Sequence, residues 1–429
     1  MRQRFSIKGA EYDEGDAGLQ PALARVYETP ERPKCLCVPG GVDMVVARYA
    51  DFVLKRFPDT GPKHHPTCPS YEMEASESGR GELLGSAITE HSAEGWEIRT
   101  KFPLTRVPGK SIVRGAPGTP TEVKTGVKAA SMLALLHELW ERAGFNRWYP
   151  AMKGKRNWGV IRSHLLAEAA RARTKNQRLS EAMLLAEPFD KERSAAQQAA
   201  RREALAALTS PMGDVQHRFL IVVGELKEAE ESPLGIKLRL KHMSEIALLV
   251  DASTWAKTKK AFQTQLQVHE SDDSTRLIVA GLIYSPADQT YAIDQITFML
   301  TTATWIPVED GNDNELIRAL TEQERRFLRP LRYDSKRWGA FANAKLLDTG
   351  DQAASLHILS DRLPKDVLAA KGQAIARSFG AWVWKAGASM PSLPPATSRY
   401  VPTFTLASPP GPAGTVAPRG ARRLSRTAG

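Results

Sequence analysis

The chain has 429 residues, of which 42% are hydrophobic and 25% are charged, and its formal net charge is +11. This composition is that of an ordinary globular protein with enough apolar residues for two or three cores, and it excludes a chain that is disordered throughout. No apolar run approaches the roughly 18 residues of a transmembrane helix, so we expect no membrane partner.

The N-terminal third of the chain has the alternation of β-strands. The first residues are polar and mixed in charge, and we expect an extended lead-in over 1–29. They lack the apolar stretch of a secretory signal, so the expected compartment is the cytoplasm. Alternating apolar and polar residues then predict strands at 44–48, 52–56 and 96–102. Residues 30–125 are therefore predicted to form a small β-rich module.

All three cysteines of the chain lie in this module, together with two adjacent histidines. Cys35 and Cys37 precede the strands, and His64, His65 and Cys68 follow them. Zinc prefers four tetrahedral ligands drawn from thiolate and imidazole. Because the strands can fold one group back onto the other, the sequence predicts a Cys3His zinc site. We favour His64 over His65 as the nitrogen ligand, because its longer offset from Cys68 gives the chain more room to turn.

Two other interpretations of the cysteines stay open. The single residue between Cys35 and Cys37 is a shorter gap than the two residues of most structural zinc sites. Free cysteine is also among the most buried residue types, so the three thiols could simply pack in a small core without metal. A disulfide between Cys35 and Cys68 is the third option, which a reducing cytosol disfavours.

The same window resembles a known family. Cys-Leu-Cys at 35–37, the run at 53–61 and the run at 64–72 resemble a bacterial family catalogued as domain of unknown function 1173. The resemblance continues through 135–148 and 223–228, so it covers most of the chain. It implies three cysteines near the N-terminus and an association with plasmids and integrated mobile elements. It implies no established activity.

The middle of the chain changes to a helical period after a linker rich in Pro, Gly and Thr at 108–126. Apolar residues from Met132 to Trp140 recur at spacings of three and four, which predicts an amphipathic helix. A second helix is predicted from about Asn157 and a third over 189–208. We therefore expect a helical domain over 126–212.

Positive charge is concentrated in this helical domain, where residues 147–178 carry nine Lys or Arg and a single acid, Glu168. Two helices joined by a short turn could form a helix-turn-helix motif, although the turn here is longer than usual. The alternative is a solvated helix face. We predict DNA or RNA contact through 147–178, by phosphate neutralisation. The residues predicted for this contact are Lys153, Lys155, Arg156, Arg162, Arg171 and Arg173.

The last part of the chain returns to strands. A continuous apolar run at 218–224 and a hairpin that ends near 301 are followed by helices, which predicts an α+β domain over 213–389. Residues 390–429 lack apolar periodicity and are predicted to form a disordered tail. The predicted fold class is thus α+β and multidomain: a β-rich module with a zinc site, a basic helical middle, an α+β domain and the tail.

The only catalytic candidates in this last domain are Glu225 and Lys227, which follow an apolar strand as in metal-dependent nucleases. Such a site needs an aspartate on a neighbouring strand, whereas Asp214 lies in the preceding loop. The function we predict is a non-enzymatic, zinc-stabilised protein that contacts nucleic acid. The alternatives are a nuclease-like enzyme, and a structural or interaction protein with packed thiols. The sequence does not determine the oligomeric state.

Overall fold

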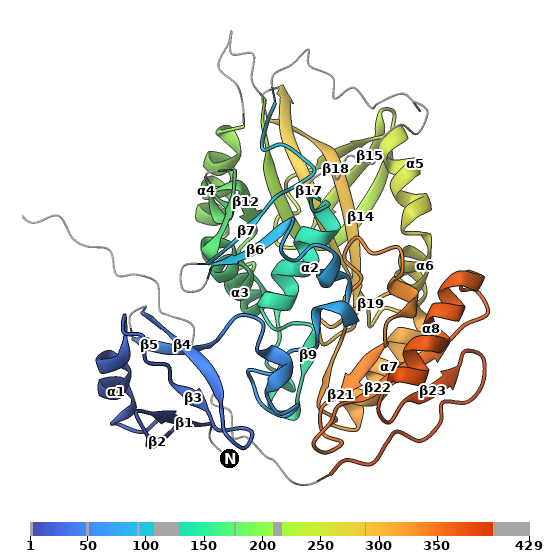
Figure 1. Cartoon of the computed structure of the whole chain (residues 1–429). Coiled ribbons are helices and arrows are strands. Elements are labelled where there is room, and N and C mark those ends of the chain that lie inside the picture. The colour runs from blue at the N-terminus through green and yellow to red at the C-terminus, as the bar shows by residue number, and fades with distance from the viewer. Residues whose placement is uncertain are drawn as a thin grey trace, which may run out of the picture.

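The structure is a computed structural model of the chain (Figure 1). Its class is α+β, because helices and strands are interspersed along the described residues. No helix in the part of the chain that the structure describes is both long and apolar enough to cross a lipid bilayer. The described residues are 3–48, 51–91, 95–106, 128–175, 177–208, 217–287 and 289–397.

The N-terminal module is a five-stranded antiparallel sheet in the order β2-β1-β3-β4-β5, with one helix against it. The predicted strands at 44–48 and 52–56 are present. The elements are β1 (Arg4–Ile7), β2 (Ala10–Asp13), α1 (Leu19–Val26), β3 (Lys34–Cys35), β4 (Val42–Arg48) and β5 (Phe52–Arg56).

The expected extended lead-in over 1–29 is wrong for its folded part, because β1, β2 and α1 occupy most of it. Phe5 and Ile7 alternate inward from β1, and both are buried. Leu23 and Val26 form the buried stripe of α1. Stretches this short carry too few periods for the sequence pattern to separate them from polar coil.

A second, four-stranded sheet joins this region to the middle of the chain in the order β11-β10-β7-β6. Its β7 pairs in parallel with β10, from which it is far removed in sequence. The expected boundary near residue 125 therefore does not end a sheet, and the linker at 108–126 lies outside the described residues. The strands are β6 (Ile88–His91), β7 (Gly95–Ile98), β10 (Ala172–Thr174) and β11 (Gln177–Arg178); beside them β8 (Thr105–Arg106) pairs with β13 (His217–Arg218).

The largest element is a seven-stranded sheet in the body of the protein (Figure 1). It follows the order β12-β14-β15-β16-β18-β17, with β19 on β18, and β14 also pairs with β17. Its strands are β12 (Met183–Leu185), β14 (Leu220–Ser232), β15 (Gly235–Leu240), β16 (Leu248–Asp251), β17 (Arg276–Ala287), β18 (Thr290–Thr301) and β19 (Pro307–Val308).

Both faces of this sheet are covered, which explains the continuous apolar runs of its strands. Ile221 and Val223 face one core together with the inward residues of α2 and α3. Val222 faces a second core that includes Phe262. The helices of the body are α2 (Met132–Arg142), α3 (Trp158–Arg171), α4 (Ser194–Ala206), α5 (Ala252–Ala261), α6 (Gln263–Ser271), α7 (Gly311–Glu322) and α8 (Lys365–Arg377).

Another five-stranded sheet, near the C-terminus, has the order β23-β22-β21-β20-β9. Its edge strand β9 belongs to the middle of the chain, so the predicted helical domain at 126–212 contributes to sheets of the domain that follows it. One hydrophobic core likewise contains residues of all three predicted domains. The strands are β9 (Arg147–Trp148), β20 (Phe327–Leu328), β21 (Ala344–Leu346), β22 (Ala354–Leu359) and β23 (Trp382–Lys385).

The segment at 75–82 lies directly against the body. The backbone N–H of Gly79 donates to the carbonyl of Leu331 over 3.0 Å. A Cβ on Gly79 would lie 1.9 Å from the Arg332 carbonyl oxygen, so only glycine allows this approach. The Ser335 hydroxyl donates to Glu82 over 2.5 Å, which fastens the same contact.

The first residues of the predicted disordered tail are bound to the body, which corrects that expectation for 390–397. The indole N–H of Trp382 donates to the carbonyl of Ser392 over 3.0 Å. The Arg325 guanidinium donates to the carbonyl of Pro394 over 2.7 Å. These are polar backbone contacts, which leave no periodicity in the sequence. The remainder of that predicted tail lies outside the described residues.

Candidate metal centre

Two turns bring the cysteines and His64 together. Cys35 ends β3, and Cys37 lies in the turn that leads into β4. Gly41 closes this turn with φ at +67°, and a Cβ there would lie 3.0 Å from the Lys34 Cβ, so the position needs glycine. His64 follows the 3-10 turn η1 (Gly61–Lys63), and Cys68 lies one turn later, where its N–H bonds the carbonyl of His65.

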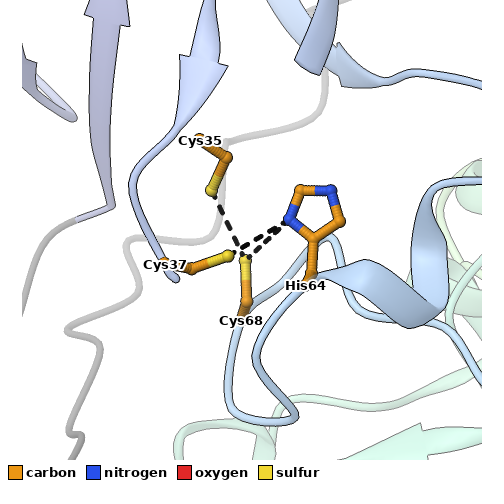
Figure 2. Close-up of side chains that lie close together, drawn as sticks. All are labelled: Cys35, Cys37, His64 and Cys68. Atoms are coloured by element: carbon orange, nitrogen blue, oxygen red, sulfur yellow. Dashed lines mark hydrogen bonds between the residues drawn. The ribbon is translucent and has the colours of Figure 1, made fainter. Parts of the chain in front are cut away.

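The three sulfurs and one nitrogen of His64 form a compact group (Figure 2). The Sγ atoms of Cys35 and Cys68 are 3.7 Å apart. His64 Nδ1 lies 3.3 Å from the Sγ of Cys37 and 3.7 Å from that of Cys68. All four ligand atoms lie within 4.8 Å of one another.

These separations match those around one tetrahedral zinc ion. With Zn–S bonds of about 2.3 Å, two sulfurs lie about 3.8 Å apart, and an imidazole nitrogen lies about 3.5 Å from each sulfur. A disulfide requires sulfurs about 2.05 Å apart, and all three cysteines are free. A Cys3His site that could hold a metal ion is therefore present, and the structure does not contain the disulfide.

The site is buried and has a polar neighbour. Cys35, Cys68 and His64 are 0%, 1% and 2% exposed. The amide Nε2 of Gln3 lies 3.7 Å from the Sγ of Cys35 and 3.6 Å from that of Cys68, where its N–H groups donate to the sulfurs. Such donors orient ligands and stabilise thiolates. The sequence reasoning missed Gln3, because a polar residue within a polar lead-in gives no signal.

The two histidines have different surroundings. His65 Nδ1 bonds the hydroxyl of Thr67 over 2.8 Å, and its Nε2 lies 3.5 Å from Asp351. His65 is thus turned away from the sulfurs, and the predicted ligand alternatives resolve in favour of His64. The Nε2 atom of His64 is buried without a hydrogen-bond partner among the described residues.

The pKa values of two thiols in the cluster are shifted in opposite directions. Hydrogen bonds from Cys35 and Cys68 lower the pKa of the Cys37 thiol to about 3. The hydrogen bonds with Cys37 and Cys68, together with burial, raise the pKa of the Cys35 thiol. Three packed sulfurs cannot all ionise side by side without a compensating cation. A divalent metal would supply that charge and release the remaining protons.

The basic residues predicted to contact nucleic acid do not share one role. Lys153 is exposed and pairs with Glu324 over 2.8 Å. The exposed ammonium of Lys155 has no hydrogen-bond or ion-pair partner among the described residues. The Arg156 guanidinium donates to the carbonyls of Gly144 and Thr304 over 3.1 and 3.2 Å. Burial lowers the pKa of Arg156 to about 10.

The other three predicted contacts also differ. Arg162 donates to the carbonyl of Leu185 over 2.9 Å, and Arg171 pairs with Glu168 over 2.9 Å. Arg173 is exposed on β10. The connection between α2 and α3 contains β9 and a 3-10 turn, which makes it longer than the turn of a helix-turn-helix motif.

Glu225 and Lys227 do not form the catalytic arrangement of a metal-dependent nuclease. Glu225 is 4% exposed and bonds Lys241 over 2.6 Å and Arg276 over 3.1 Å. Lys227 is exposed on the same strand. Over the described ranges, the Cys/His cluster is the only group of three or more His, Cys, Asp or Glu side chains whose ligand atoms lie close enough together to hold a metal ion. Among the described residues, the ion-pair partners of Glu225 are both basic, and no second carboxylate joins it in a metal-binding group.

One of three comparisons with known proteins gave a match. A family model described as "Protein of unknown function (DUF1173)" matches residues 5–387 and so contains all four side chains of the cluster. Neither the curated proteins nor the solved structures gave a match. The family that the cysteine window resembles is thereby confirmed. Since the match covers most of its length, the chain belongs to the DUF1173 family of proteins of unknown function.

Proposed function

We propose that Cys35, Cys37, His64 and Cys68 bind one structural zinc ion, in a protein that contacts nucleic acid and has no catalytic activity of its own. The observation that supports zinc is the compactness of the four ligand atoms, which lie within 4.8 Å of one another, with three of their separations between 3.3 and 3.7 Å. Protein side chains fill all four coordination positions, whereas a catalytic zinc keeps one position for water or substrate.

The structural role follows from what the site would connect. Cys35 belongs to the N-terminal sheet, and His64 and Cys68 belong to the loop that leads to the body. The core around the cluster is small, and it joins Phe5 and Met44 of the N-terminal sheet to Leu328 and Leu347 of the body. A small core gains little from apolar burial alone, so metal binding would contribute directly to its folding free energy.

The zinc proposal is tested on the purified full-length protein. Metal analysis should find about one zinc per chain. Cys37→Ser should lose that zinc, because it removes one of the four ligands. His65→Ala is the matched control, since His65 neighbours His64 but is turned away. Wild-type protein without zinc, or equal zinc loss in both variants, would contradict the proposal.

Nucleic-acid contact is supported by a different observation, the hairpin of β10 and β11. Arg173 and Arg178 are directly paired across the two strands, and both are exposed. Lys175 is exposed in the same hairpin. Like charges directly opposite destabilise a strand pair. Glu97 on β7 is the cross-strand partner of Arg173, but its carboxylate lies against His91, and no ion pair of the described residues reaches Lys175 or Arg178. Phosphates of DNA or RNA would relieve the repulsion that remains.

The hairpin is tested by binding to nonspecific duplex DNA at two salt concentrations. Affinity should fall steeply with salt, and Arg173→Glu with Arg178→Glu should weaken binding to all sequences alike. Lys153→Glu is the control, because Lys153 already has an acidic partner. Binding that ignores salt and the double substitution would refute the contact.

Two further expectations belong to the same proposal. Free thiols suit a reducing compartment, which supports a cytoplasmic location. The association with plasmids and integrated elements, which the family resemblance implied, is consistent with a protein that contacts nucleic acid.

A further inference from the structure

A cavity of about 300 Å³ lies beside the connection between α2 and α3. One wall is the segment that follows Cys68 and includes Pro69 and Met73. The opposite wall contains Phe145 and Lys155. The volume is at the lower end of the range for small-molecule sites.

The charge of this cavity is positive. Arg147, Lys155 and Arg156 line it, as does Arg142, whose charge is balanced by Glu90 and Glu138. Arg147 donates to the carbonyls of Pro69 and Tyr71, and Arg156 likewise bonds carbonyls. Carbonyl oxygens satisfy the hydrogen bonds of a guanidinium but do not neutralise its charge. Over the ranges that the structure describes, none of the first three cations has a carboxylate partner.

The acids of the lining do not balance these cations. Glu72 is engaged by Arg56. Glu141 lies 2.8 Å from the Tyr333 hydroxyl, which is also 2.9 Å from Glu138. The Tyr333 hydroxyl has one proton and can donate only one of these two hydrogen bonds. The proton of the second hydrogen bond must therefore come from one of the two carboxyl groups. Burial raises the pKa of Glu141 to about 7, and this residue therefore carries only part of a charge at neutral pH.

Other parts of the lining are apolar. Phe145, Met152 and Leu328 all face the cavity. His164 meets Phe145 edge-on, with ring centroids 5.6 Å apart. A bare inorganic anion would leave this apolar surface uncovered. A ligand with both an anionic group and an apolar body fits the two kinds of wall.

We propose that this cavity binds a small organic anion, whose phosphate or carboxylate group lies at Lys155 and whose apolar body packs against Phe145 and Met152. Lys155 is the charged group best placed for this contact, because its ammonium has no other partner among the described residues. The site is separate from the zinc cluster, although the segment after Cys68 forms one of its walls.

The probe for this site is 8-anilinonaphthalene-1-sulfonate, an aromatic anion whose fluorescence rises in an apolar environment. We expect saturable binding of about one probe per full-length chain. Lys155→Glu should weaken it about tenfold or more, because an attraction becomes a repulsion inside a partly closed site. Lys155→Arg should restore the affinity. Lys153→Glu is the matched control, since Lys153 is also exposed but lies outside the lining.

Competition then identifies the anionic group. Displacement of the probe by adenosine monophosphate assigns a phosphate, and displacement by 4-hydroxybenzoate assigns a carboxylate. Displacement by neither compound, probe binding without saturation, or equal affinity in Lys155→Glu and Lys153→Glu would overturn the proposal. Zinc content is measured on the same samples and should be equal in all of them, so failure of this site is distinguishable from failure of the zinc site.

Discussion

Two glutamates on α2 allow a sharp test of the buried charge network. Glu138 is 0% exposed and accepts hydrogen bonds from Arg80 over 3.0 and 3.1 Å and from Tyr333 over 2.9 Å. Arg142 adds an ion pair. Burial alone would raise the pKa of Glu138, but Arg80 and Arg142 outweigh it and hold the pKa at about 2. Glu141, one turn later, has its pKa raised to about 7.

We expect Glu138→Gln to destabilise the fold by about 3 kcal/mol. A fall in pKa from 4.5 to about 2 corresponds to roughly 3 kcal/mol of stability at neutral pH. Removing the charge also leaves Arg80 buried without its main partner, and broken buried pairs typically cost about 3–5 kcal/mol. Glu141→Gln should not destabilise the fold at pH 6, because at that pH the wild-type carboxyl is ionised in the unfolded chain and must take up a proton on folding.

The assay is urea unfolding of both variants from pH 3 to pH 8. The stability from Glu138 is present above pH 4.5, the pKa expected on unfolding, and is lost as the pH falls through about 2. Glu141 has the opposite sign: its contribution is present below pH 4.5 and is lost as the pH rises through about 7. The free energy of unfolding of Glu141→Gln should therefore rise relative to that of wild type as the pH approaches 8. Equal losses in the two variants at every pH would refute the reasoning.

Three other predictions concern separate parts of the molecule. Chelation of zinc should speed hydrogen exchange in residues 30–70 and leave β14 and β17 protected, because those strands lie in the body. Deletion from residue 390 should lower the thermal midpoint more than deletion from residue 398, because only the longer deletion removes the bond from Trp382 to Ser392. Glu225→Gln should destabilise the fold measurably, since Lys241 and Arg276 lose their shared partner. Wild-type protein should show no magnesium-dependent cleavage of DNA. Robust cleavage would revive the nuclease alternative.

The Cys3His cluster could be predicted from sequence because it rests on residue chemistry. Thiolate and imidazole are specific zinc ligands, and the strands between the two groups have a clear alternation. The long strands β4 and β14 and the helix α2 were predictable for the same reason, since several periods of apolar spacing define them. The contact of Gln3 with the sulfurs could not be predicted, because any polar side chain that the fold brings near can donate a hydrogen bond to them.

The pairings between distant segments could not be predicted. β9 has two residues and β10 has three, which is too short for any period. The basic cluster was misleading for a different reason. Charge in a sequence carries no information about what neutralises it, and Arg156 proved to bond carbonyls inside the protein. Domain boundaries drawn from composition missed these contacts, because tertiary partners and not local pattern decide where a core ends.

The bond between Gly79 and Leu331 has a consequence for biosynthesis. Its two partners are separated by about 250 residues, which a ribosome adds at roughly 5–20 per second, so the contact waits on the order of 10–50 s. The Cys/His cluster has all four of its side chains between residues 35 and 68, so they leave the ribosome long before that moment. The core around that cluster also contains Leu328 and Leu347, so it stays incomplete in the nascent chain. Its exposed apolar residues would be a substrate for chaperones until the last third of the chain emerged.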